Sequence, residues 1–144
     1  MKPKNRIRLF LVDDDAVFLK LLQIEFTQNA DMEIETFSTG ELCIENLSHK
    51  PDIVILDYFL NSIERDAIDG IQTLDRIKEF NPAIQVIMLS SQDKIDVAVN
   101  CMHHNAFDYV VKSETAFMRL KLIITNIIQH QKLEKELSWY MERM

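Results

Sequence analysis

The 144-residue sequence predicts an α/β fold with a doubly wound, five-stranded parallel sheet and an extended C-terminal helix. Two observations support this fold class. Short apolar runs alternate with amphipathic segments along the chain, and most of the runs are continuously apolar. Continuously apolar strands separated by helices are typical of a parallel sheet that is covered on both faces. Right-handed crossovers then place helices on both sides of the sheet.

The predicted strands are short runs that differ in how the apolar residues are spaced. The run at 32–37 alternates polar and apolar residues, which indicates a strand with one covered face. The other four are nearly continuous in apolar residues, as expected for strands buried on both faces. The five predicted strands span residues 7–12, 32–37, 53–56, 84–89 and 107–111.

The first two predicted helices have recognisable starts. Three aspartates precede the first helix, and we assign Asp15 as its N-cap. Ser38-x-x-Glu41 has the form of a capping box and predicts a short second helix that runs to Leu47. The apolar residues of the first helix recur at helical spacing, at Phe18, Leu19, Leu22 and Phe26.

The third and fourth predicted helices follow the third and fourth strands. Asn81-Pro82 closes the third helix, because a proline disfavours helical backbone in the residue before it. We assign Ser91 as the N-cap of the fourth helix. The apolar stripe of the third helix is Ile71, Leu74, Ile77 and Phe80, and that of the fourth is Ile95, Val99 and Met102.

One long helix is predicted from about Thr115 to the C-terminus. We assign residues 5–130 to a single domain and residues 131–144 to an extension of this helix. A narrow apolar stripe in the extension has the spacing of a coiled coil. Two heptads are too few to separate a dimerisation stalk or linker from a helix that packs on its own domain. The stripe consists of Leu133, Leu137, Tyr140 and Met144.

Composition excludes several classes of function. The net charge of −7 and the pI of about 5.0 argue against direct nucleic-acid binding, which needs a basic surface. We interpret the basic residues Lys2, Lys4, Arg6 and Arg8 as a solvated lead-in to the first strand rather than a nucleic-acid arm. Gly40 and Gly70 are the only glycines, so a glycine-rich phosphate loop is excluded.

The cysteines and the N-terminal segment predict a cytoplasmic protein. Cys43 and Cys101 lack metal-ligand spacing and lie in apolar patterns, so we expect buried free thiols, which fit a reducing compartment. Three aspartates interrupt the apolar stretch near the N-terminus. This stretch is therefore too short for a signal peptide or a membrane span, and we expect no membrane association.

Charged and hydroxyl side chains follow the predicted strands at their carboxyl ends. Asp13 and Asp14 follow the first strand, Asp57 the third, Ser90 the fourth and Lys112 the fifth. Parallel strands bring these ends to one edge of the sheet, where ligands bind in such folds. Crowded carboxylates need a cation, and oxygen ligands suit Mg²⁺. Such a site favours phosphoryl transfer, with one carboxylate as the nucleophile.

The sequence resembles the receiver domain of two-component response regulators, with the chemotaxis regulators as the nearest type. The resemblance covers roughly residues 5–130 and implies a flavodoxin-like sheet of order 2-1-3-4-5. Four motifs in the expected order carry it: LVDDD at 11–15, PDIVILDYFL at 51–60, IMLSS at 87–91 and AFDYVVK at 106–112.

The resemblance implies that the protein is a signalling phosphoacceptor rather than an enzyme. A histidine kinase or histidine phosphotransfer protein would donate the phosphoryl group, and the receiver would catalyse its own phosphorylation and dephosphorylation. A homodimer would form through helix four, strand five and helix five, or through the C-terminal helix. The implied residues are Asp57 as phosphoacceptor; Asp14, Asp13, Asp57 and the backbone carbonyl of Phe59 for Mg²⁺; and Ser90, Lys112 and Tyr109 for catalysis and switching.

The sequence departs from the family pattern at two places. Ser113 follows Lys112, where the family usually has a proline after a cis peptide bond. The segment from Asp57 to Gly70 is several residues longer than usual and lacks the usual proline. The insertion, near 61–67, carries Glu64, Arg65 and Asp66, and we expect it to alter access to the site or to contact a partner.

Two other functions compete with the receiver interpretation. Asp13-x-Asp15-x-Val17 also fits the first motif of haloacid-dehalogenase-like phosphatases, in which Asp13 would be the nucleophile and Asp15 the general acid and base. That interpretation leaves Asp57 unexplained. The other alternative is a receiver-like interaction module that is not phosphorylated, which Ser113 and the insertion would favour.

Overall fold

The computed structural model describes residues 6–29, 31–63 and 65–144. Its centre is a five-stranded parallel sheet with the strand order β2-β1-β3-β4-β5, as predicted. Lys2 and Lys4 of the basic lead-in, and Glu64 of the insertion, lie outside the described residues. The strands are β1 (Ile7–Val12), β2 (Met32–Phe37), β3 (Ile53–Asp57), β4 (Gln85–Ser90) and β5 (Asp108–Val111).

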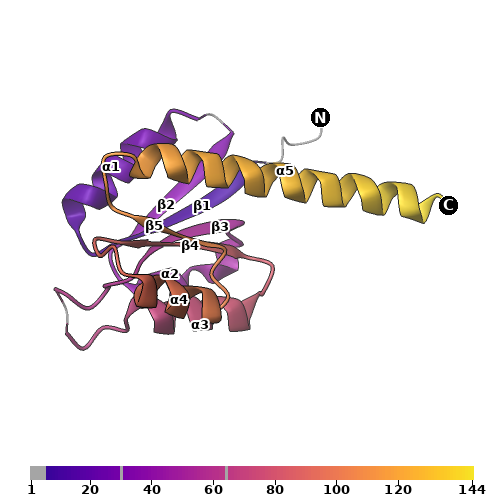
Figure 1. Ribbon diagram of the computed structural model, residues 1–144. Coiled ribbons are helices and arrows are strands. Elements are labelled where there is room, and N and C mark those ends of the chain that lie inside the picture. The colour runs from indigo at the N-terminus through magenta and orange to yellow at the C-terminus, as the bar shows by residue number, and fades with distance from the viewer. Residues whose placement is uncertain (1–5, 30, 64) are drawn as a thin grey trace.

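Helices cover both faces of the sheet (Figure 1). α1 and α5 lie on one face, and α2, α3 and α4 lie on the other. The helices are α1 (Ala16–Thr27), α2 (Gly40–Glu45), α3 (Gly70–Phe80), α4 (Ile95–His103) and α5 (Ala116–Glu142), with a short 3-10 turn at Leu47–His49.

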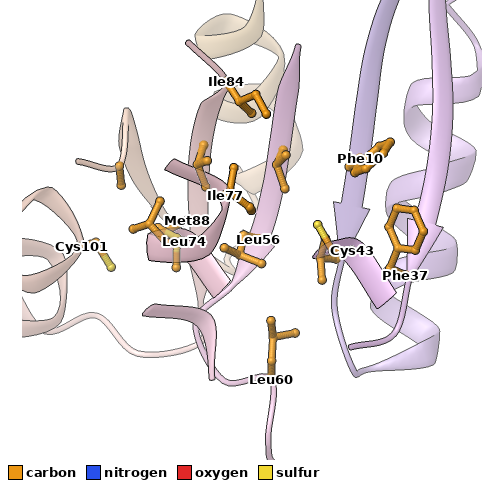
Figure 2. Close-up of a cluster of buried hydrophobic side chains, with 14 of the residues drawn as sticks. Phe10, Phe37, Cys43, Leu56, Leu60, Leu74, Ile77, Ile84, Met88 and Cys101 are labelled. Atoms are coloured by element: carbon orange, nitrogen blue, oxygen red, sulfur yellow. The ribbon is translucent and has the colours of Figure 1, made fainter. Parts of the chain in front are cut away.

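Alternate residues of each central strand enter different cores, because successive side chains of a strand point to opposite faces. In β1, Leu9 and Leu11 pack under α1 and α5, whereas Phe10 and Val12 pack under the other three helices. Figure 2 shows the second of these cores. Both faces need apolar residues, which explains the continuously apolar strands.

The predicted cysteine environment is confirmed. Cys43 and Cys101 are free and buried on the α2–α4 side of the sheet (Figure 2). Burial raises the pKa of the Cys43 thiol to about 12 and that of Cys101 to about 11. Both thiols therefore stay protonated at neutral pH, as expected for packing residues.

Local capping agrees with the sequence at α1 and differs at α2. The Asp15 side chain accepts the backbone N–H groups of Val17 and Phe18, at 3.0 and 3.2 Å, and caps α1 as predicted. The predicted Ser38–Glu41 capping box is wrong. α2 begins one residue later, and the hydroxyl of Thr39 caps it by accepting the Leu42 N–H. α2 also ends at Glu45, short of Leu47.

The predicted stripe of α4 is also wrong. Val97 and Cys101 face the core, whereas Ile95, Val99 and Met102 are exposed. The apolar residues of α4 spread over more than half of its circumference, so periodicity alone could not choose which part is buried. Nor does Ser91 cap it, since α4 begins after Lys94 and has no side-chain cap.

α5 is longer than the domain that it covers. Its buried side chains end at Ile127, and the helix continues to Glu142 beyond the body of the domain (Figure 1). The stripe of Leu133, Leu137, Tyr140 and Met144 is exposed, at 61–102% of each residue's surface. Among the described residues, no helix is apolar over a length that would cross a membrane.

Candidate functional site

The carboxyl ends of β1, β3, β4 and β5 bring together the polar residues that the sequence singled out. Asp13 follows β1, and Asp57 and Ser90 are the last residues of β3 and β4. All three are buried, with 0%, 4% and 0% of their surfaces exposed. Buried polar side chains in an otherwise apolar sheet need partners to offset the loss of water. Lys112, just after β5, supplies a charged partner.

Lys112 forms an ion pair with Asp13 and lies close to Asp57. Its Nζ is 2.8 Å from Asp13 Oδ2 and 3.5 Å from Asp57 Oδ1. The other Asp13 oxygen, Oδ1, accepts the Asp15 N–H at 2.9 Å. Burial lowers the pKa of Lys112, but the hydrogen bond to Asp13 and the charges of Asp57 and Asp13 outweigh burial and raise it. Lys112 therefore stays protonated at neutral pH.

The Lys112 side chain also lies over an aromatic ring of α1. Its Nζ is 4.5 Å from the centre of the Phe18 ring, within the range of a cation–π interaction. Phe18 was predicted only as a core residue of α1. The sequence offered no signal for this contact, because Phe18 and Lys112 are distant in the chain.

Three carboxylates of the site are close enough to share one cation. Oxygens of Asp13, Asp14 and Asp57 lie within 4.8 Å of one another. Burial, together with the negative charge of Asp13, raises the pKa of Asp57 to about 8 although Lys112 opposes the shift. The single positive charge of Lys112 therefore does not balance the three carboxylates. A hard divalent cation such as Mg²⁺, which prefers oxygen ligands, would offset the remaining negative charge. The donor set fits the cofactor that the sequence predicted.

The segment after β3 is held against the site by Asp14 and Gly70. The N–H of Phe59 points to Asp57 Oδ1 at 3.4 Å, and the Gly70 N–H donates to the Tyr58 carbonyl at 3.1 Å. Ser62, in the insertion, donates both its N–H and its hydroxyl to Asp14 Oδ2. The sequence analysis did not single out Ser62. The Phe59 carbonyl remains a predicted ligand.

Ser90 and Tyr109 meet at the same backbone segment. Ser90 Oγ accepts the Gln92 N–H at 3.0 Å, and the Tyr109 hydroxyl donates to the Gln92 carbonyl. Tyr109 is half-buried against the core on the α2–α4 side, and burial raises the pKa of its phenol. A change at Ser90 can therefore reach Tyr109 through one residue.

The loop after Lys112 keeps its position without the usual proline. The Lys112 N–H donates to the Ser90 carbonyl at 2.8 Å, which extends the β4–β5 pairing by one residue. Ser113 Oγ lies 3.2 Å from the Thr115 hydroxyl. No peptide bond between the described residues is cis.

Comparison with known families gives a match over most of the chain. The family model of the response regulator receiver domain matches residues 9–124. The transcriptional regulatory protein ZraR of Klebsiella oxytoca is 28% identical over 131 residues, which cover 91% of this chain and 28% of ZraR. The chain therefore spans less than a third of this relative.

Solved structures give the same result. The signal receiver domain of a LuxO repressor protein from Vibrio parahaemolyticus has a TM-score of 0.78 and 26% identity, covering 92% of this chain and 97% of that one. A CheX–CheY–BeF3–Mg²⁺ complex from Borrelia burgdorferi has a TM-score of 0.72 and 26% identity, covering 85% of this chain and 89% of that one.

Proposed function

The chain belongs to the response regulator receiver domain family, and from this premise we propose that Asp57 accepts a phosphoryl group. The donor is a phosphohistidine of a histidine kinase or of a histidine phosphotransfer protein. The observation that supports this most directly is the grouping of Asp57, Asp13, Asp14 and Lys112 at one edge of the sheet. Asp57 is better suited to attack than Asp13, because Lys112 and the Asp15 N–H engage the two oxygens of Asp13 at 2.8 and 2.9 Å, whereas Lys112 lies 3.5 Å from Asp57.

In the proposed reaction, a carboxylate oxygen of Asp57 forms a bond to phosphorus as the bond from phosphorus to the imidazole nitrogen breaks. The imidazole leaves with that electron pair and takes up a proton. Lys112 stabilises the phosphoryl oxygens. Mg²⁺ held by Asp13, Asp14, Asp57 and the Phe59 carbonyl would neutralise charge there. The Mg²⁺ and BeF3 named for the Borrelia complex support this ion for the site.

Ser90 and Tyr109 are the proposed switch. A phosphoryl group on Asp57 would offer an acceptor to the Ser90 O–H, whose oxygen already accepts the Gln92 N–H, so movement of Ser90 toward Asp57 would shift the Gln92 backbone as well. Movement of this segment would change the Tyr109–Gln92 contact and so the surface around α4, β5 and α5. The proposed partners of this surface are other proteins, and a homodimer would use it or the extension of α5.

The same geometry disfavours the phosphatase alternative. The Asp15 side chain caps α1, with Oδ1 accepting two backbone N–H groups, and this structural role accounts for the residue without a catalytic one. We therefore propose a signalling role in the cytoplasm, without direct contact with nucleic acid or membrane by these residues.

The proposal is tested by intact mass after incubation with acetyl phosphate and Mg²⁺. Wild type is expected to gain one phosphoryl group, and Asp57→Asn none. Asp13→Asn should react slowly, because it loses a partner of Lys112 and of the cation. An adduct that persists in Asp57→Asn and disappears in Asp13→Asn would support the phosphatase alternative. An unmodified wild type would leave the interaction module as the better description.

A further inference from the structure

The insertion after β3 is attached to the rest of the domain on both sides of Ser62. Before Ser62, Leu60 is buried and points into the core on the α2–α4 side (Figure 2). After it, the Ile68 N–H donates to a Glu41 carboxylate oxygen of α2 at 3.1 Å. These two attachments restrict where the segment between them can lie.

Between the attachments, Ser62 contacts Asp14 through two donors. The backbone N–H lies 3.1 Å from Asp14 Oδ2, and the hydroxyl donates to the same oxygen. Two donors on Oδ2 restrict the rotation of the carboxylate, and none of the described residues donates a hydrogen bond to Oδ1. Asp14 needs such support, because it is only half-buried and the negative Asp13 and Asp57 lie beside it.

We propose that Ser62 is a positioning residue for the cation at this site. Ser62 orients the Asp14 carboxylate so that Oδ1 faces Asp13 and Asp57. The inference rests on the proposed function, since it concerns the Mg²⁺ that phosphorylation requires. Orientation is favoured over competition, because Asp14 remains within the 4.8 Å carboxylate cluster while Ser62 holds it. The insertion then favours binding of the ion in advance of phosphorylation.

Thermodynamic linkage makes the coupling between Mg²⁺ binding and the Ser62–Asp14 contact reciprocal. If the Ser62–Asp14 contact favours Mg²⁺ binding, bound Mg²⁺ must favour the contact by the same factor. The insertion then opens less often when the ion is present. Arg65 is exposed within the insertion, so trypsin cleavage after Arg65 reports how often the segment opens.

The test is a calorimetric titration of the unphosphorylated protein with MgCl2, for wild type and three variants. Ser62→Ala is expected to weaken Mg²⁺ binding by about threefold to tenfold. This loss is smaller than the loss expected when a fully buried hydrogen-bond partner of a metal ligand is removed, because Ser62 is exposed. Ser62→Thr keeps the hydroxyl and should bind Mg²⁺ like wild type. Asn61→Ala, an exposed neighbour, is the matched control.

The second readout is the rate of trypsin cleavage after Arg65, followed by mass spectrometry. Mg²⁺ should slow this cleavage in wild type and slow it less in Ser62→Ala. Unchanged or tighter Mg²⁺ binding in Ser62→Ala would overturn the inference, since Ser62 would then be neutral or a competitor. A wild type that binds no Mg²⁺ would instead contradict the proposed function itself, which separates the two failures.

Discussion

Gly70 allows the first turn of α3 to lie directly against the end of β3. A Cβ atom at this position would lie 2.4 Å from the Asp57 carbonyl oxygen and 2.7 Å from the Tyr58 Cα. Both neighbours are backbone atoms, so a side chain cannot be accommodated by rotamer changes. This close approach places α3 beside the site and sets the path of the chain after Asp57.

Gly70→Ala should therefore be destabilising. We expect the free energy of unfolding to fall by about 1–3 kcal/mol, in the range for overpacking of a well-packed site. Urea unfolding followed by circular dichroism measures the change. Lys132→Ala, on the exposed extension of α5, serves as control and should stay within about 0.5 kcal/mol of wild type. Equal stability of Gly70→Ala and wild type would show that the backbone around Tyr58 can shift freely.

Among the elements, α5 runs from the edge of the sheet formed by the carboxyl ends of the strands to the edge formed by their amino ends. It begins four residues after Lys112, at the edge that carries the carboxylates. A groove of about 580 Å³ lies beside its later turns, lined also by Pro51, Gln85 and Phe107, which precede or begin β3, β4 and β5. Its extension therefore leaves the domain at the edge opposite to the site. A rigid helix can carry a small displacement between these edges.

The exposed stripe of this extension leads to a prediction about self-association. Leu133 and Leu137 would be buried if two copies paired along α5. The double variant Leu133→Lys and Leu137→Lys should weaken the dimer at least tenfold, because each lysine would place a charge in the apolar seam. Stability should change little, since both leucines are exposed in a single copy.

Sedimentation velocity over a range of concentrations measures this effect. The matched control is the double variant Lys132→Ala and Glu136→Ala, which alters the same turns off the stripe. Wild type that sediments as a monomer throughout the range would contradict pairing through α5. A dimer that is unaffected by the lysines would place the interface elsewhere, such as the exposed apolar face of α4.

At the scale of the whole molecule, the site opposes folding when no cation is bound. The carboxylates of Asp13 and Asp57 are buried side by side, in a chain whose net charge is already −7. The raised pKa of Asp57, about 8 against an ordinary value of 3.8, means that its ionised form costs stability in the folded state. That cost grows as the pH rises from about 4 and is complete above about pH 8.

Asp57→Asn should consequently be more stable than wild type when Mg²⁺ is absent. At about pH 8.5 with a chelator, we expect a gain of about 1–3 kcal/mol, which shrinks as the pH falls toward 4. Added Mg²⁺ should raise the melting temperature of wild type more than that of the variant. Thermal unfolding measures both, with Asp66→Asn as an exposed control. A variant that is less stable than wild type under these conditions would mean that Lys112 already balances the site.

Local sequence patterns were enough to predict the order of the strands and helices along the chain and the residues at the carboxyl ends of the strands. Both depend on local patterns: continuous apolar runs, helical spacing and the polar residues that end each run. Asp13, Asp57, Ser90 and Lys112 meet because parallel strands share an edge, a rule that holds for any sheet of this kind.

Features that depend on contacts between distant segments could not be predicted from the sequence. The buried face of α4 followed from packing, because Val97 and Val99 are equally apolar and only one of them can face the sheet. The Phe18–Lys112 and Ser62–Asp14 contacts join residues far apart in the chain, and no local pattern marks them. Where a side chain's partner is fixed by the path of another segment, sequence periodicity carries no information about it.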